Sequence, residues 1–150
     1  MEKSWSLRQV RSSDADRVAA HSQYNEAPGS ERHILYANWV RPRIESGRYV
    51  GWFAVDGDQV IGGAGAILLD WGPTRANPGG VMARVNNVFT EGGWRRRGVS
   101  RALLLSVFGQ CEAMGVREFN LGATPAAKPL YCALGFESYP AEMRRRVVAA

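Results

Sequence analysis

Cysteine is scarce in this chain of 150 residues. Cys111 and Cys132 are the only two, and neither stands in a CxxC pair or in a cluster with histidine. A structural zinc site needs four ligands at characteristic spacing, and a disulfide framework needs several cysteine pairs. We therefore expect two reduced thiols that serve in packing, no metal site and no disulfide framework.

Long apolar runs are also missing. No uninterrupted stretch approaches the roughly 18 to 20 apolar residues that a membrane-spanning helix requires. The first ten residues, MEKSWSLRQV, carry charges where a secretory signal peptide would be apolar. We expect a soluble cytoplasmic protein without a membrane partner.

Charge of one sign is not concentrated anywhere along the chain. Nineteen Lys and Arg against 14 Asp and Glu give a net charge of +5, and the basic runs at 95–97 and 144–146 have only three residues each. This balance favours an anionic partner, but it is too small and too dispersed to require nucleic acid.

The chain does contain many short periodic segments, which change type several times. With 45% hydrophobic residues there is enough apolar material for one core, so we expect a single domain over 1–150 that mixes helices and strands. Aromatic and β-branched residues predict strands at 4–10, 49–55, 59–69, 81–90 and 116–121. Three- and four-residue spacings and capping residues predict helices at 13–24, 30–39, 99–114 and 125–134.

The connections between these segments indicate how they are arranged. Asp56-Gly57-Asp58 is typical of a tight hairpin, and Pro42 is expected to kink or end the second helix. The loop 70–80, rich in Pro, Gly and Asn, is a candidate to approach a substrate. The succession of strand 81–90, helix and strand 116–121 is a crossover, which makes the two strands parallel neighbours with a crevice at their carboxyl ends.

The segment from Val88 to Arg101, VFTEGGWRRRGVSR, is the most informative in the chain. An extended apolar run breaks into a basic turn containing Gly98, and an amphipathic helix follows. The N-terminus of that helix would direct unpaired N–H groups and a positive dipole end toward the arginines. This arrangement is suited to a diphosphate.

Two motifs carry a resemblance to a known family. The turn Arg95 to Ser100, RRRGVS, resembles the acetyl-CoA signature of the GNAT-type N-acetyltransferase superfamily: Gln or Arg, two variable residues, Gly, one variable residue, then Gly or Ala. The later segment 124–136, TPAAKPLYCALGF, resembles that superfamily's Ala-rich helix ending in Tyr and a Gly-Phe pair. Order and separation of the two motifs also agree. The resemblance is strongest over 81–136.

Four positions depart from the family pattern. Ser100 replaces the final Gly or Ala, Thr124 replaces a frequent Asn, Gly92 replaces a frequent Pro, and Pro129 enters the short helix. The resemblance implies an α/β (α+β) fold with a mixed, mostly antiparallel central sheet flanked by helices. It also implies a splayed strand that binds the cosubstrate acetyl-CoA.

The resemblance assigns specific positions to acetyl-CoA. Backbone groups of the strand end would pair with the pantetheine arm and the acetyl carbonyl, and the basic turn would surround the diphosphate. The positions are Val88, Phe89, Thr90, Arg96, Arg97, Gly98, Val99, Ser100 and Arg101.

Tyr131 is the catalytic candidate. The resemblance places its hydroxyl beside the thioester sulfur, where it would donate a proton to the departing thiolate. The spacing of residues by itself favours a tyrosine whose ring packs in the core, and the surrounding segment LYCALGF favours the acid role. Cys132 is expected to pack rather than to act as a nucleophile.

Direct transfer of acetyl to a primary amine of a small molecule or peptide is the expected reaction. The sequence leaves the general base open, with candidates Glu26, Asp70, Glu91, Asn86 or Asn87 holding a water, His21 and His33. Aromatic residues that either line the acceptor pocket or pack in the core are Tyr24, Tyr36, Trp39, Trp52 and Trp71.

Two other functions stay open at this point. A noncatalytic acyl-CoA-binding regulatory domain would keep the basic turn without transferring acetyl. A nucleic-acid-binding module would need the arginines to form one continuous surface stripe. Dimerisation is open as well, since the terminal strands of the sheet expose pairing edges.

Overall fold

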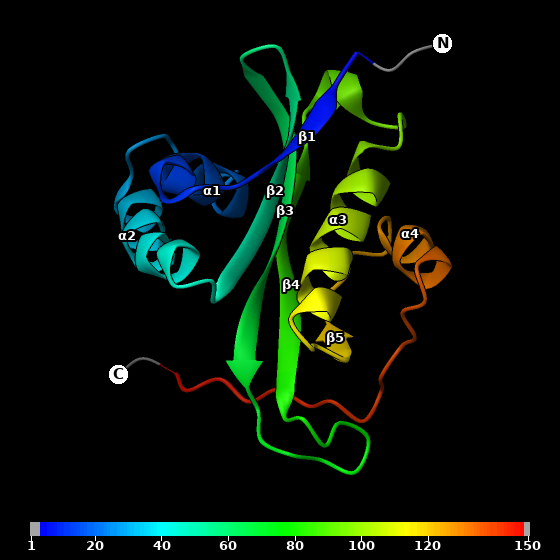
Figure 1. Ribbon diagram of the computed structural model, residues 1–150. Coiled ribbons are helices and arrows are strands. Elements are labelled where there is room, and N and C mark those ends of the chain that lie inside the picture. Colours follow the sequence, from blue (N-terminus) through cyan, green and yellow to red (C-terminus); the bar gives the residue numbers. More distant parts are fainter. Residues whose placement is uncertain (1–3, 149–150) are drawn as a thin grey trace.

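The sheet has five strands in the order in which they occur along the chain (Figure 1). The computed structural model describes residues 4–148, so the two ends of the predicted domain 1–150 lie outside the described residues. The strands are β1 (Ser6–Gln9), β2 (Tyr49–Asp56), β3 (Gln59–Asp70), β4 (Val81–Thr90) and β5 (Glu118–Asn120). Strands β1 to β4 are antiparallel, and β5 lies parallel to β4. The predicted mixed, mostly antiparallel sheet is therefore confirmed.

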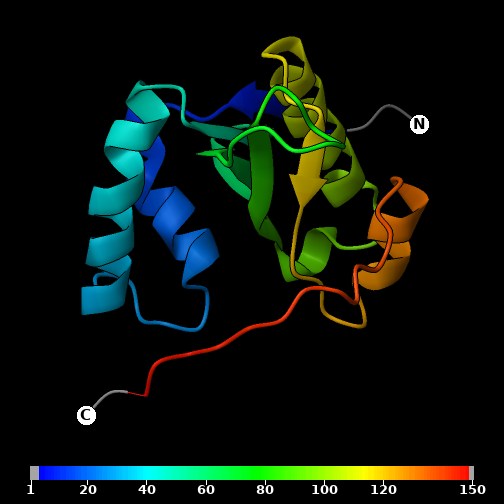
Figure 2. The same ribbon diagram turned by 90° about the horizontal axis from the view of Figure 1, so that it is seen from below.

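Two layers of helices cover the sheet. Figure 2 shows α1 (Ala15–Ser22) and α2 (Glu31–Glu45) on one side, and α3 (Val99–Ala113) and α4 (Lys128–Ala133) on the other. On the α3 side, Leu103, Leu104 and Val107 are fully buried in one apolar cluster. On the other side, Val18 and Val40 belong to a second cluster. Burial of two such faces against one sheet supplies the main driving force for this arrangement.

The second helix continues past Pro42, and the prediction that it ends near Trp39 was wrong. Proline removes one backbone donor, which costs stability inside a helix. Here Val40 is fully buried, and Ile44 packs against the same apolar cluster beyond the proline. The packing on both sides of Pro42 keeps the last turn helical.

Strand β4 contains a bulge in its second half. Gly65 of β3 pairs with Asn86, but Gly63 pairs with Phe89, so β4 has one more residue than β3 in this interval. Asn87 takes a left-handed conformation with φ 57°. Asparagine tolerates this region better than most residues, and a bulge bends the strand that contains it.

Strand β5 leaves β4 just before the bulge. Its register runs only from Met82 paired with Glu118 to Arg84 paired with Asn120. From Val85 onward, the outer edge of β4 has no neighbouring strand among the residues described. The splayed strand predicted from the sequence is thus present, and the loop 71–80 lies at the opposite end of β4 from the basic turn (Figure 1).

Candidate functional site

A pocket of about 260 Å³ opens where β4 and β5 separate. The pocket is lined by the bulge of β4, by the segment that follows β5 and by the start of α4. The lining residues are Val85, Asn86, Asn87, Val88, Leu121, Gly122, Thr124, Ala127 and Tyr131. Of the residues predicted to bind or act, the structure therefore brings four to one pocket: Asn86, Asn87, Val88 and Tyr131.

Tyr131 is held in place by the residues that end its helix. The N–H of Phe136 donates to the carbonyl of Tyr131 at 3.0 Å, and the N–H of Gly135 donates to that of Cys132 at 3.1 Å. Gly135 has φ 96°, so these bonds form a Schellman motif that requires glycine at this position. The ring of Phe136 also meets that of Tyr131 edge to face, with centroids 5.8 Å apart. The Gly-Phe pair therefore positions the tyrosine.

The environment of Tyr131 keeps its hydroxyl protonated. The residue is only 8% exposed, and this burial raises the pKa of its phenol. Within residues 4–148 the hydroxyl has no hydrogen-bond partner. A protonated, unpaired hydroxyl that lines a pocket is available to donate to a ligand.

Pro129 does not weaken the helix that carries Tyr131. It occupies the first turn of α4, where an N–H would have no partner within the helix. The neighbouring Cys132 is exposed, so the expectation that this thiol packs in the interior was wrong, whereas Cys111 is buried.

The basic turn presents a row of free N–H groups. Gly98 has φ 77° and caps α3, and Arg96 has φ 62°. Helix α3 has no side-chain cap, and the first N–H of this region that finds a backbone acceptor is that of Ala102, which donates to the carbonyl of Gly98. In the described part of the chain, the N–H groups of 96–101 have no acceptor. Such a turn at a helix N-terminus is suited to an anion.

Side-chain contacts fix this turn to the end of β4. The hydroxyls of Thr90 and Ser100 lie 2.8 Å apart, and Arg95 Nε donates to the carbonyl of Thr90 at 3.3 Å. The guanidinium of Arg97 lies over the ring of Trp94 at 4.9 Å. Serine at position 100, a departure from the family pattern, thus contributes a hydrogen bond between strand and helix.

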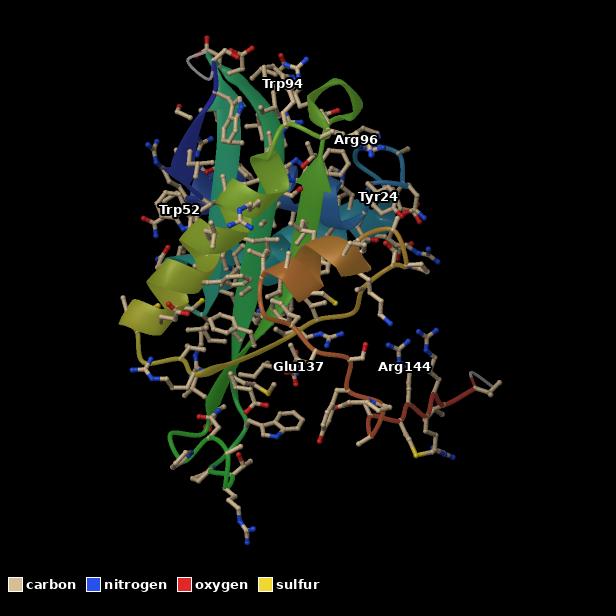
Figure 3. The ribbon with its side chains drawn as sticks, turned by 90° about the vertical axis from the view of Figure 1, so that its right-hand side faces the viewer. Tyr24, Trp52, Trp94, Arg96, Glu137 and Arg144 are labelled. Atoms are coloured by element: carbon tan, nitrogen blue, oxygen red, sulfur yellow. The ribbon has the colours of Figure 1, made fainter. Side chains whose placement is uncertain are left out.

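The two arginine runs lie far apart. Arg96 and Trp94 project at one end of the molecule, and Arg144 lies toward the other end (Figure 3). The two runs do not form the continuous stripe that a nucleic-acid-binding surface requires.

The bulge is anchored by a hydrogen-bond network that the sequence did not reveal. Asn87 Nδ2 donates to the hydroxyl of Tyr36 at 2.8 Å and to that of Tyr49 at 3.1 Å. The amide nitrogen of Asn87 is therefore used in the structure to hold the bulge between two tyrosines. Two adjacent asparagines inside a strand were the available signal, because this residue is disfavoured in strands and tolerated at bulges.

His21 is buried and neutral. Its ring stacks on Phe89 with centroids 4.8 Å apart, and its Nε2 has no partner. Burial, with a smaller contribution from Arg17, lowers its pKa to about 4. His33 holds the loop before α2, since its Nδ1 accepts from Gly29 and its Nε2 lies 2.9 Å from the carbonyl of Asp16. Neither ring lines the pocket beside Tyr131.

The other predicted residues have separate locations. Glu26 is paired with Arg32 at 2.9 Å, and Asp70 ends β3 far along the sheet from the bulge. Trp52 Nε1 donates to Gln110 at 2.9 Å and packs with α3. Glu91 stands directly after β4. None of these four side chains belongs to the lining of the β4 and β5 pocket.

A protein-family model described as an acetyltransferase (GNAT) domain matches residues 18–149. The chain belongs to the GNAT acetyltransferase family. The resemblance carried by the basic turn and the segment 124–136 is therefore confirmed. No curated protein matches this GNAT acetyltransferase significantly.

Solved structures share the fold of this GNAT acetyltransferase. A predicted acetyltransferase from Clostridium acetobutylicum, solved with acetyl-CoA, has a TM-score of 0.86 and 18% identity, over 95% of this chain and 96% of that one. A GCN5-related N-acetyltransferase from Ralstonia eutropha JMP134 has a TM-score of 0.84 and 24% identity, over 95% and 98%. The aminoglycoside N-acetyltransferase AAC(6')-Iy has a TM-score of 0.75 and 18% identity, over 98% and 100%.

Residues 4–148 offer neither a cluster of metal ligands nor a membrane-spanning helix. This part of the GNAT acetyltransferase contains no group of three or more His, Cys, Asp or Glu side chains placed to hold a metal ion. None of its helices combines the length and the apolar character needed to cross a bilayer.

Proposed function

We propose that the chain acts as one domain, 1–150, which transfers acetyl from acetyl-CoA directly to a primary amine. One observation carries this proposal: three features meet along strand β4. Its edge is open from Val85 to Thr90, the hydroxyl of Tyr131 lies beside that edge, and free N–H groups follow the end of the strand. The related structure from Clostridium acetobutylicum contains acetyl-CoA, and that of AAC(6')-Iy contains a bisubstrate analogue of CoA and acetylneamine.

The diphosphate of acetyl-CoA is assigned to the basic turn. Residues 96–101 supply backbone N–H groups, α3 directs its positive dipole end at the same place, and Arg96 adds a cationic side chain without a partner in the described residues. The pantetheine arm is assigned to the unpaired edge of β4 at Val88, Phe89 and Thr90. An extended amide chain adds to such an edge as another strand would.

The transfer then needs few groups from the protein. The nitrogen lone pair of the neutral amine attacks the thioester carbonyl carbon, the new C–N bond forms, and the C–S bond breaks. The thiolate takes the proton of Tyr131, and the proton lost by the amine returns to the tyrosine through water, so that the products are an N-acetylated amine and CoA thiol. Positioning on β4 and protonation by Tyr131 are the contributions of this chain.

Tyr131→Phe tests the catalytic role. We expect acetyl-CoA affinity to be retained and kcat for CoA thiol release to fall about 100-fold, the range that a positioned general acid contributes. The control is Tyr139→Phe, because Tyr139 is 69% exposed and lies outside the pocket. Equal turnover of the two variants removes Tyr131 from the mechanism. A wild type that binds acetyl-CoA and acetylates no amine identifies a noncatalytic acyl-CoA-binding domain.

Gly98→Asp tests the diphosphate site. A Cβ at Gly98 meets no atom within 4 Å, so the substitution adds charge without a clash. We expect acetyl-CoA affinity measured by calorimetry to fall at least about tenfold. The control is Gly115→Asp, at the other end of α3, with a similar φ of 93° and equally open surroundings. Equal affinities of the two variants place the diphosphate elsewhere.

A further inference from the structure

A second hollow, of about 300 Å³, lies between the end of α1 and the exposed face of α2. Its lining combines two aromatic rings, one aliphatic side chain and two polar side chains: Gln23, Arg32, Leu35, Tyr36 and Trp39. We call it the aromatic groove. Leu35 is 62% exposed and Trp39 is 38% exposed. Apolar side chains left in solvent around one hollow are typical of a ligand surface.

Tyr36 connects the aromatic groove to the reaction pocket. Its ring lines the groove, and its hydroxyl accepts from Asn87 Nδ2 at 2.8 Å. Asn87 itself lines the pocket that contains Tyr131. The ring that lines the groove is therefore linked by one hydrogen bond to the bulge of β4, where the amine must arrive.

The lining of the aromatic groove contains one charged side chain, the guanidinium of Arg32. The lining contains no carboxylate. The nearby Glu26 is bound to Arg32 at 2.9 Å, and the guanidinium of Arg43 lies over the Trp39 ring at 4.4 Å. A ligand carrying several positive charges finds no counter-ion in this lining, and like charges at close range oppose its binding.

The two rings favour a flat apolar body. The centroids of Tyr36 and Trp39 lie 5.4 Å apart with their planes inclined by 50°, so the two rings pack against each other and form one continuous aromatic surface of the groove. Aromatic groups pack against such a surface in stacked or edge-to-face geometry, in addition to burying apolar surface.

We infer that the acceptor is a monoamine with an aromatic body, which binds in the aromatic groove and extends its amine past Tyr36 to the bulge. This inference rests on the proposed acetyl transfer and specifies its substrate class. The amine forms one amide bond to the acetyl carbon, and CoA thiol is released, as in the step given above. Polycationic aminoglycosides and polyamines are poor substrates, although a relative of the same fold is an aminoglycoside acetyltransferase.

An amine panel measures the preference directly. CoA thiol release is followed with phenethylamine, ethylamine, spermidine, kanamycin and a lysine-containing peptide. We expect kcat/KM for phenethylamine to exceed that for each of the other four at least about tenfold, which corresponds to about 1.4 kcal/mol of transition-state binding. Ethylamine is the matched probe for the ring, and spermidine is the probe for added charge.

Two variants locate the preference in the groove. Trp39→Ala should raise KM for phenethylamine about tenfold and change kcat little, because it removes a wall remote from the reacting atoms. Trp71→Ala is the control, since Trp71 is 63% exposed and lies outside the groove. Arg32→Glu should instead raise kcat/KM for spermidine. Calorimetry with phenethylamine on the same variants gives a readout that does not need turnover.

The outcomes separate the inference from the proposed function. Acetylation of spermidine, kanamycin or the peptide at a kcat/KM equal to or above that of phenethylamine overturns the aromatic acceptor and leaves amine acetylation intact. An equal KM for Trp39→Ala and Trp71→Ala also overturns it. If acetyl-CoA binds and no amine releases CoA thiol, both the inference and the proposed transfer are wrong.

Discussion

Lowering the pH should destabilise this protein through His21, and the structure gives the size of the effect. The side chain is 6% exposed, lies between Phe53 and Phe89, and leaves its Nε2 without a partner. Protonation would place a charge in an apolar site close to Arg17. Burial and that charge lower the pKa of His21 from 6.5 to about 4 in the folded protein.

The sign and the pH window follow from this difference. The pKa of the unfolded chain is the ordinary one, so the stabilising contribution of neutral His21 is fully present above it. As pH falls from about 6.5 to about 4, the unfolded chain binds a proton that the folded protein does not, and stability is lost. The loss of stability is about 2 kcal/mol at pH 5. It reaches about 3 kcal/mol below the pKa of His21 in the folded protein, because each unit of pKa difference between the two states corresponds to about 1.4 kcal/mol.

Urea unfolding at about pH 7 and about pH 5 measures the loss. His21→Leu keeps an apolar side chain in the site and removes the titrating group. Between about pH 7 and about pH 5, the wild type should therefore lose about 2 kcal/mol more of its free energy of unfolding than the His21→Leu variant loses. His33→Gln is the control, because His33 is partly exposed on α2 and lies outside the apolar site of His21. If His21→Leu and the wild type lose the same stability, His21 is not the buried neutral group described here.

Three further substitutions probe the strands and the turn of the site. Gly65→Ala should cost about 2 to 3 kcal/mol in urea unfolding, because its Cβ would collide with the Tyr49 hydroxyl. Asn87→Ala should cost at least about 2 kcal/mol and weaken amine turnover, since it strains a φ of 57° and leaves two tyrosine hydroxyls without their donor. Ser100→Ala should cost about 1 kcal/mol through the lost contact with Thr90, while acetyl-CoA affinity in calorimetry stays within about twofold, because the backbone N–H groups remain.

Local sequence signals predicted the elements that frame the site. The strand 81–90 and the start of the helix at Val99 were predicted with the bounds that the structure has. Both predictions depend only on residues that are neighbours in the sequence. The strand follows from a run of residues with high β-propensity, and the helix follows from a basic turn with glycine before apolar residues at helical spacing. The resemblance of 124–136 likewise placed Tyr131, since its position depends on the Gly-Phe pair that closes α4.

The features that sequence reasoning missed depend on residues distant in the chain. The hydrogen bonds of Asn87 reach Tyr36 and Tyr49, 51 and 38 residues away. The extension of α2 past Pro42 depends on burial of Val40 in a cluster that includes residues of β2. The sequence left Trp52 between an acceptor pocket and the core, and its contact with Gln110, 58 residues away, decides for packing on α3. Single-sequence patterns carry no direct record of such pairings.

Strand β4 explains how two substrates can be placed with little positional error. Thr90 is bonded to Ser100 of α3 on one face of the sheet, and Asn87 is bonded to Tyr36 of α2 on the other, three residues away (Figure 2). The proposed thioester site and the proposed acceptor groove are thus fixed to one short segment of backbone. Because transfer requires the amine nitrogen within about 3.5 Å of the carbonyl carbon, a rigid common support reduces the entropy lost on reaction. Changes at Leu35 and Trp39 of α2 can then alter the acceptor without removing the hydrogen bond of Tyr36 to the cosubstrate strand.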